Sequence, residues 1–486
     1  MRKYTKYYFI FLIFCCSFIA VSGSYAAIIN ASSCSSAHIQ AAINSASSGD
    51  TVSVPAGTCT WTSGVTIPDG KTIHVVGAGN GVDGTVIKYS TGGTINGNSQ
   101  GYTISNFRFL VKSGCTNNCI TARNIGWRIH DNYFGHETPE EGDNWAIMPH
   151  GSGDGVTGRH PQGLIDNNTF ANMKIVVYGE SNSSFLGQCT IWSQDNEFGG
   201  DATGGAHTVY VENNDFSDRV HGNIMDANNG GKYVFRYNTC SGASPEIMTH
   251  SLQKDQERGT KSFEIYGNTI TLTAYRYCIM FLRGGTGFVW GNTVTGSTDG
   301  IALDNVRSYS DEAGGDCGRC NGTSDWDENT PGESGWACRD QIGRGKDTSL
   351  WTDENQYPAQ EDEPAYFWGN RDDGSQMGLG IYNTCEDWIH ADRDYFREVA
   401  SFDGSSGVED SGTYAAMIEI TPTTTGVGYW CTDKGGNWNK TNEDANDGCL
   451  YYWDGDSWEV KYTPLTYPHP LRDKLTPPSG LKVIAQ

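Results

Sequence analysis

Short runs of β-forming residues recur through the middle of the chain, and each run ends in a similar turn. The recurring motif is a few β-branched or aromatic residues, an asparagine, any residue and then an apolar residue. Asparagine tolerates the left-handed backbone of a tight turn, so each copy predicts a strand, a turn and a second strand. The copies contain Asn132, Asn168, Asn196, Asn214, Asn238, Asn268 and Asn292, and residues 363–370 look like one more.

The spacing of these asparagines predicts the architecture. They lie 36, 28, 18, 24, 30 and 24 residues apart, which is a fixed motif at a variable period. One motif per coil of a stacked solenoid explains that pattern, and the asparagines of successive coils could then hydrogen-bond to one another. Propeller blades would need about 40–45 residues each, and hairpins would need two-residue turns that are absent. We therefore predict an all-β, right-handed parallel β-helix.

The region before the first asparagine motif predicts a cap for the first coil. Residues 38–43 place Ile39 and Ile43 on one face of a short amphipathic helix. Such a helix can cover the apolar side chains and strand edges at the open end of a solenoid. Short strands are predicted after it, at residues 52–54, 65–67, 73–76 and 85–87.

Residues 49–58, Gly-Asp-Thr-Val-Ser-Val-Pro-Ala-Gly-Thr, follow the predicted helix. Together with the asparagine motifs they resemble β-helix proteins of the pectate-lyase-like superfamily over roughly residues 30–310. The resemblance implies the fold. It does not imply one activity, because the superfamily includes lyases, hydrolases, epimerases, tail spikes and non-catalytic adhesins.

The chain divides into three predicted parts. Residues 1–27 have a basic start, an apolar run and a small-residue end, which is the layout of a secretory signal peptide, with an uncleaved anchor as the alternative. Residues 28–307 are the predicted β-helix. Residues 308–486 are rich in Gly, Asp, Glu, Trp and Tyr and predict loop-rich C-terminal coils or a cap packed on the helix, or else a small separate domain. We expect a secreted protein (extracellular, cell-surface or periplasmic) without a transmembrane segment in the mature chain.

Charge and cysteines narrow the range of partners. The net charge of −24 disfavours nucleic acid. An acidic polysaccharide would need a local basic patch or bound divalent cations to offset repulsion.

Thirteen of the fifteen cysteines follow residue 27, so disulfides are expected in an exported chain and at least one thiol lacks an intramolecular partner. Cys278, in an apolar strand, is a candidate for a buried free thiol.

Polar residues recur near one end of the strands that precede the asparagine motifs. When Ile224, Ile247, Ile279 and Ile301 are aligned, four polar side chains fall near one strand end on consecutive coils: Asp226, His250, Arg283 and Asp304. Coils stack about 4.8 Å apart, so the four would span about 15 Å, the length of a few sugar units. Further charged residues are predicted beside the same edge: Glu180, His221, Lys254, Arg258 and Lys261.

These residue types suit the cleavage of a polysaccharide. In β-elimination, a cation neutralises the uronate carboxylate and a base removes the α-proton. Arg283 or a bound cation could neutralise the carboxylate, and the candidate bases are His250, Lys254 and Lys261. The predicted catalytic set is His250, Arg283, Lys261 and Asp226. The predicted substrate-binding set is Asp304, Lys254, Arg258, Glu180 and His221. Hydrolysis would instead need Asp226 and Asp304 as a carboxyl pair, three coil steps apart.

Part of this set resembles characterised lyases. Lys261 and Arg283 are similar to the Lys and Arg on neighbouring coils of chondroitinase- and alginate-lyase-like β-helices. Residues 282–285, Leu-Arg-Gly-Gly, are similar to their Leu-Arg-His-Gly stretch, with Gly284 where those proteins have histidine. Polygalacturonase-like motifs fit the sequence less well.

Calcium is a candidate cofactor. Residues 325–329 begin like an Asp-rich calcium loop, with Asp325, Asp327 and Asn329 as candidate ligands, and residues 442–448 are a similar fragment; solvated acidic loops are the alternative.

Aromatic residues of the tail could stack on sugars or simply form a core: Trp430, Trp438, Tyr451, Tyr452, Trp453 and Trp458. Two functions are compatible with all of this. One is a secreted protein that binds and cleaves a polysaccharide, by elimination rather than hydrolysis; the other is a non-catalytic glycan-binding adhesion or matrix protein.

Overall fold

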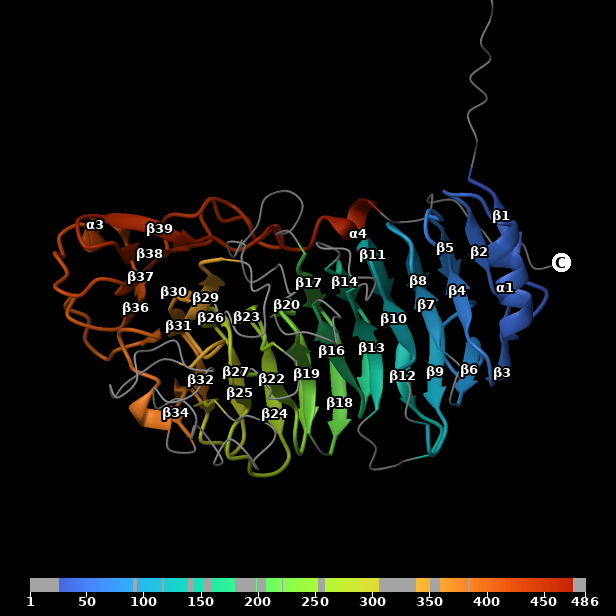
Figure 1. The fold of residues 1–486 in the computed structure, drawn as a ribbon, viewed down its shortest axis with the longest axis horizontal. Helices are drawn as coiled ribbons and strands as arrows, with labels where there is room; N and C mark the ends of the chain where they lie inside the picture. Colours follow the sequence, from blue (N-terminus) through green and yellow to red (C-terminus); the bar gives the residue numbers. More distant parts are fainter. Residues whose placement is uncertain are drawn as a thin grey trace, which may run out of the picture.

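The strands of this protein build three long sheets that run side by side along the molecule (Figure 1). The computed structural model describes residues 26–90, 94–115, 118–138, 144–151, 160–179, 198, 207–220, 222–251, 258–305, 338–349, 359–382 and 385–474. We call the three sheets sheet 1, sheet 2 and sheet 3. From β2 to β28, successive strands enter sheet 1, sheet 3 and sheet 2 in turn, and every third strand is the next neighbour in its sheet. The chain is therefore a coil of stacked three-strand turns, and the predicted right-handed parallel β-helix is confirmed.

The bounds of the strands follow this order. Sheet 1 contains β1 (Ile28–Asn30), β2 (Thr51–Ser53), β5 (His74–Val76), β8 (Thr103–Ser105), β11 (Ile125–His130), β14 (Gln162–Asp166), β17 (Val209–Glu212), β20 (Lys232–Arg236), β23 (Ser262–Tyr266), β26 (Thr286–Trp290), β31 (Ala365–Trp368) and β35 (Tyr395–Arg397). Sheet 2 contains β4 (Val65–Ile67), β7 (Ile95–Gly97), β10 (Ile120–Ala122), β13 (Trp145–Pro149), β16 (Lys174–Tyr178), β19 (Asn223–Asn228), β22 (Glu246–Thr249), β25 (Met280–Leu282), β28 (Ile301–Leu303) and β34 (Leu379–Ile381). Sheet 3 contains β3 (Gly57–Trp61), β6 (Thr85–Tyr89), β9 (Phe107–Val111), β12 (Tyr133–His136), β15 (Thr169–Ala171), β18 (Asp215–Arg219), β21 (Thr239–Gly242), β24 (Thr269–Leu272), β27 (Thr293–Thr295), β32 (Arg371–Asp372) and β33 (Ser375–Gln376).

A ladder of buried asparagines links the coils, as the recurring motif predicts. Within the ladder each Nδ2 donates to Oδ1 of the next asparagine, as Asn238 does to Asn268 at 3.1 Å. The rungs are Asn132, Asn168, Asn214, Asn238, Asn268, Asn292 and Asn370. Because every rung also bonds to backbone, the ladder satisfies buried turn groups that would otherwise lack partners.

One copy of the motif is not a rung. Asn168 bonds directly to Asn214, and β14 pairs directly with β17. The interpretation of Asn196 as the mark of a separate coil is therefore wrong. Residue 196 itself lies outside the described residues, and the motif there belongs to the long connection between two adjacent coils.

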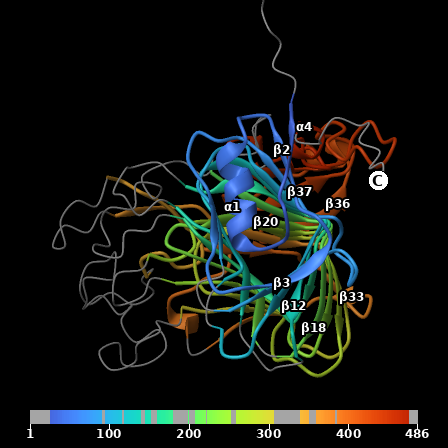
Figure 2. The same cartoon turned by 90° about the vertical axis from the view of Figure 1, so that its right-hand side faces the viewer.

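The first coil is closed by α1 (Ser36–Ser45), which lies across the end of the helix in Figure 2. Ser35 caps it by accepting a hydrogen bond from the N–H of His38. Ile39 and Ile43 are buried against the first strands, so the predicted capping helix is confirmed. A disulfide joins Cys34 to Cys59 beside this cap, and Cys278 is a buried free thiol, as expected.

The tail extends the helix and then folds back over sheet 1. Strands β31, β32, β34 and β35 add to the three sheets beyond residue 307. A separate sheet follows, made of β36 (Val408–Gly412), β37 (Gly428–Cys431), β38 (Cys449–Trp453) and β39 (Trp458–Tyr462), with the short helices α3 (Tyr414–Met417) and α4 (Leu471–Lys474). In Figure 1 this sheet lies at the C-terminal end of sheet 1, and the chain after β39 runs along sheet 1 to α4, which contacts β11. Arg236, for example, donates to the backbone oxygen of Leu465 at 2.8 Å.

Of the tail aromatics, Trp430 and Trp438 pack in the interface between the tail and sheet 1 and form part of its core. Trp430 and Trp438 are each 7% exposed. The ring of Trp430 lies 4.9 Å from that of Trp290 on sheet 1, measured between centroids. Among the described residues, no helix is long and apolar enough to span a membrane.

Candidate functional site

The residues at the ends of the sheet 2 strands form one row along the helix. The strand pairing places one residue of each successive coil beside the equivalent residue of the coil before. We call these residues the strand-end row: Arg123, His150, Tyr178, Asn228, His250, Arg283 and Asp304. Since neighbouring strands lie about 4.8 Å apart, the row is a column of closely spaced polar groups.

The alignment of four isoleucines predicted from the sequence is wrong on two coils. On β19 and β25 the methionine after the isoleucine, Met225 or Met280, pairs with Ile247. Both residues of each Ile-Met pair are buried, so the apolar pattern alone cannot tell which one is in register. Asp226 therefore lies two residues before the row, and Asn228 takes the place in the row.

Asp226 and His250 form a hydrogen-bonded acid–imidazole pair. Nε2 of His250 lies 2.9 Å from Oδ2 of Asp226. The other carboxylate oxygen accepts the N–H of Ala227 at 2.8 Å. Burial raises the pKa of Asp226, but the nearby His250 and Arg283 outweigh burial and hold that pKa below its ordinary value. The carboxylate is thus ionised at neutral pH and orients the imidazole.

Arg283 is fixed at one end and open at the other. Its Nε donates to the backbone oxygen of Thr249 at 2.9 Å, and its guanidinium carbon lies 5.3 Å from the ring centroid of Phe281. Among the described residues, the two terminal nitrogens have no hydrogen-bond or ion-pair partner. Burial lowers the pKa of Arg283, while Asp226 and Asp304 act in the opposite direction. A held guanidinium with two unused nitrogens is shaped to receive a carboxylate.

Asp304 is enclosed rather than presented outward. It is 0% exposed. Its Oδ1 accepts the N–H of Asn305 at 2.5 Å and lies 3.3 Å from Sγ of Cys385. The row includes Asp304, as the sequence predicts, but its side chain is fully buried.

Lys261 and Arg258 belong to a different, fully buried network. Arg258 pairs with Asp340 and Asp347 at 2.7 and 3.0 Å. Lys261 donates from Nζ to the backbone oxygen of Gly345. Burial lowers the pKa of Lys261 to about 8. The structure therefore places these two candidates under the 338–349 segment, where they contact Asp340, Gly345 and Asp347.

The remaining predicted site residues are not part of the described structure. Glu180, His221 and Lys254, and the candidate calcium ligands Asp325, Asp327 and Asn329, all lie outside the described residues. Within the described ranges, no group of three or more His, Cys, Asp or Glu side chains is arranged to hold a metal ion.

Gly284 departs from the lyase-like Leu-Arg-His-Gly stretch for a steric reason. A Cβ at this position would lie 2.5 Å from the backbone oxygen of Asp340 and 2.6 Å from that of His250. No side chain fits there while the 338–349 segment packs against the coil. On the neighbouring coil, His250 is the residue of the strand-end row that lies beside Arg283.

Sequence reasoning missed the N-terminal half of the row. Arg123 and His150 directly follow their sheet 2 strands, at the same position in the row as Arg283 and His250. The signal that could have found them is the polar residue that follows each short apolar strand. It was obscured because the connections between these strands differ in length.

No protein family model and no curated protein sequence matches the chain. Among solved structures, the chain is similar to an alginate lyase from Paenibacillus sp. str. FPU-7, with 16% identity and a TM-score of 0.31 over 56% of this chain and 97% of that one. It is also similar to the PL6 family alginate lyase AlyGC, with 12% identity and a TM-score of 0.40 over 95% of this chain and 60% of that one. The chain thus spans about 60% of the length of AlyGC. The fold is a right-handed parallel β-helix.

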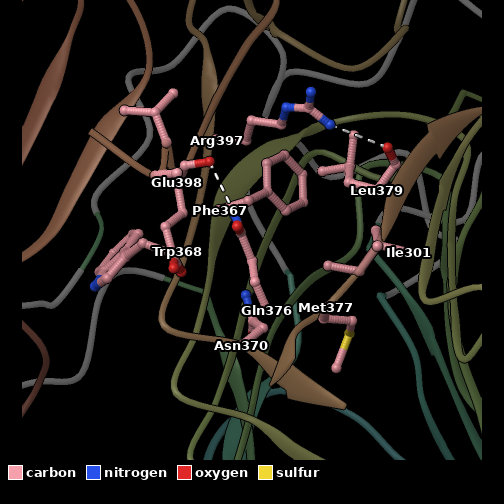
Figure 3. A pocket seen from close by; sticks show the side chains of 12 residues that line it. Ile301, Phe367, Trp368, Asn370, Gln376, Met377, Leu379, Arg397 and Glu398 are labelled. Carbon is pink, nitrogen blue, oxygen red and sulfur yellow. Dashed lines mark hydrogen bonds between the residues drawn. The ribbon is translucent and has the colours of Figure 1, made fainter. Parts of the chain in front are cut away.

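The C-terminal end of the β-helix contains a separate cavity of about 390 Å³ (Figure 3). Its floor is apolar and includes Ile301, Phe367 and Met377. The polar groups at its rim are engaged: Gln376 donates to the backbone oxygen of Glu398 at 2.9 Å, and Arg397 donates to that of Leu379 at 3.3 Å. No histidine is among the residues that line this cavity, so it contains no carboxylate–imidazole pair like that of Asp226 and His250.

Proposed function

We propose that this protein cleaves an acidic, uronate-containing polysaccharide by β-elimination at the Arg283 end of the strand-end row, outside the cytoplasm. The observation that carries the proposal is the guanidinium of Arg283. It is held by Nε, its terminal nitrogens are unpaired among the described residues, and it stands beside the Asp226–His250 pair. A nearly buried cation without a matched anion is costly, and a uronate carboxylate would supply that anion.

Each step of the proposed elimination can be assigned to one of these groups. The carboxylate of the substrate binds the terminal nitrogens of Arg283, which neutralise its charge and stabilise the enolate that develops. Asp226 accepts the Nε2 proton of His250, so the lone pair of the imidazole is on Nδ1. Nδ1 takes the α-proton of the uronate, a carbon–carbon double bond forms, and the glycosidic carbon–oxygen bond breaks. The imidazolium then gives this proton to the leaving oxygen, directly or through a water molecule, which restores the neutral imidazole.

Elimination is favoured over hydrolysis by the positions of the two carboxylates. Glycosidases need their carboxyl groups about 5–10 Å apart. Asp226 and Asp304 come from coils three steps apart, about 14 Å along the stack. Asp304 is also fully buried. A hydrolytic pair is therefore not formed by these residues.

The proposed location outside the cytoplasm has two supports. The first 27 residues have the layout of a signal peptide. Cys34 and Cys59 form a disulfide, which is typical of proteins that mature in an oxidising compartment.

The test is the release of unsaturated uronate ends from a panel of acidic and neutral polysaccharides. We expect cleavage of an acidic polymer by the wild type, and a loss of about 10²-fold or more in kcat for H250Q and for R283Q. R108Q is the matched control, because Arg108 carries the same charge on sheet 3 and stacks on Tyr133 instead.

Two results would contradict the proposal. If K261M removed turnover in a folded protein while H250Q retained it, the base would be Lys261. If the folded wild type released no unsaturated ends but still bound a polymer tightly, the chain would be a glycan-binding protein rather than a lyase.

A further inference from the structure

From Arg123 to Arg283, the strand-end row begins and ends with an arginine next to a histidine. From the N-terminal side it is Arg123, His150, Tyr178, Asn228, His250 and Arg283. We propose that Arg123 and His150 form a second carboxylate subsite, which holds the same acidic chain several sugars away from the bond that is cleaved. This inference rests on the proposed function and extends it to the length of the substrate.

Arg123 has no acidic partner in the part of the chain that the structure describes. Its side chain is half-buried, and its contacts are two long ones, from one terminal nitrogen to Nδ1 of His150 and to the backbone oxygen of Gly151, both at 3.4 Å. No carboxylate of the described residues pairs with it. In a chain with 57 acidic and 33 basic residues, a half-buried cation without a paired carboxylate is suited to an anion from outside.

His150 adds a neutral hydrogen-bonding group beside the charge of Arg123. Its Nδ1 donates to the backbone oxygen of Gly151 at 2.5 Å. Burial and the nearby Arg123 lower the pKa of His150. The ring is therefore neutral at pH 7, which leaves Arg123 as the single charge of the subsite and Nε2 as an acceptor for a sugar hydroxyl.

The residues between the two ends can support a sugar chain. The ring of Tyr178 lies 5.5 Å from that of His150 and 5.9 Å from that of Trp145, so three rings gather at this part of the face. Aromatic rings pack against the C–H faces of sugars. Asn228 is 5% exposed, and its Oδ1 has no hydrogen-bond partner among the described residues. A hydroxyl of the substrate would satisfy that buried acceptor.

The distance between the two ends sets the length of the ligand. Arg123 and Arg283 are five coil steps apart, about 24 Å along the stack. An extended chain of 1,4-linked uronates advances by about one sugar per coil step. A chain bound at Arg283 would therefore reach Arg123 with its fifth or sixth residue, whereas a trimer could not occupy both ends.

The experiment compares uronate trimers and octamers in equilibrium binding and in turnover. For R123Q we expect the octamer to bind at least about tenfold more weakly than to the wild type, whereas the trimer should bind equally well to both. On long chains KM should rise while kcat stays unchanged. R123K should recover part of the octamer affinity, because it keeps the charge but lacks the planar fork. R108Q should match the wild type with both lengths.

The outcomes separate this inference from the proposed function. Equal octamer affinity of R123Q and the wild type would overturn the second subsite, even in an active lyase. Conversely, if no unsaturated ends were released but octamer binding still depended on Arg123, the subsite would stand and the proposed elimination would fall. If neither length bound to the folded wild type, both would be wrong.

Discussion

The imidazole of His250 and the carboxylate of Asp226 lie on neighbouring coils, 2.9 Å apart between Nε2 and Oδ2. Their pairing decides which nitrogen of the ring can take a proton. The carboxylate is ionised because His250 and Arg283 outweigh its burial and lower its pKa. It therefore accepts a hydrogen bond and does not donate one.

We expect D226N to lower kcat by about 10²-fold with little change in KM, because an amide no longer fixes the proton on Nε2. The side chain keeps nearly its shape, so substrate binding through Arg283 is retained. The check is turnover on the polymer that the wild type cleaves, with circular dichroism to confirm folding. A variant with the kcat of the wild type would show that His250 acts without this orientation.

The buried asparagine ladder provides a second prediction, on stability. Asn238 donates to the backbone oxygen of Val211 at 2.9 Å and accepts from the N–H of Asn214 at 3.0 Å. N238A leaves these buried groups without partners, so we expect a loss of about 2–4 kcal/mol in the free energy of unfolding. The measurement is chemical denaturation. N167G is the control, because Asn167 lies in the same kind of turn but contacts only the carboxylate of Asp166, at 3.3 Å. Equal midpoints for the two variants would contradict the role of the ladder.

The sequence was sufficient to predict the fold because the asparagine motif is both local and repeated. Each copy marks a turn, and the stacking follows from the repetition. It was misleading at Asn196, since a motif copy inside a long connection has the same local pattern as one on a coil. The capping helix was also predicted, because Ile39 and Ile43 show its buried face directly.

The site could be predicted only in part, since it depends on strand register. Register is set by which apolar residue faces the core, and the Ile-Met pairs of β19 and β25 leave that open. Contacts between residues that are far apart in the sequence could not be predicted. Arg258 binds Asp340, 82 residues away, and nothing local to either residue indicates the pair. This pairing removes Arg258 from the predicted substrate-binding set.

Buried thiols give a third prediction, on reactivity. Burial raises the pKa of Cys278 to about 12, that of Cys431 to about 12 and that of Cys449 to about 11. Thiolate is the reactive form, so these cysteines should be alkylated slowly in the native protein at pH 8 and rapidly after unfolding. Mass spectrometry of iodoacetamide-labelled peptides measures the two rates. Cys34 and Cys59 are the internal control, because their disulfide blocks labelling in both states. A Cys431–Cys449 disulfide, or native labelling at the unfolded rate, would contradict the prediction.

The last prediction concerns pH and the buried ring of His160. This side chain is 0% exposed, and its ring lies 5.3 Å from that of His207. Burial, with His207 second, lowers the pKa of His160 from 6.5 to about 3. The folded state therefore keeps the ring neutral between about pH 6.5 and pH 3, whereas the unfolded state binds a proton. Stability is highest above pH 6.5 and falls as the pH is lowered through this window, by about 1.4 kcal/mol per pH unit from this one residue.

The variant H160Q should lose that slope, although it is less stable than the wild type at pH 7 because a buried ring is replaced. We would measure denaturation midpoints between pH 4.5 and pH 6.5, a range in which Asp226 stays ionised because its pKa is lowered. H38Q is the matched control, since His38 is exposed on α1, and its curve should run parallel to that of the wild type. If the curve of H160Q also ran parallel to the wild type, the proton uptake on unfolding would come from another residue, and His160 would be protonated in the native protein.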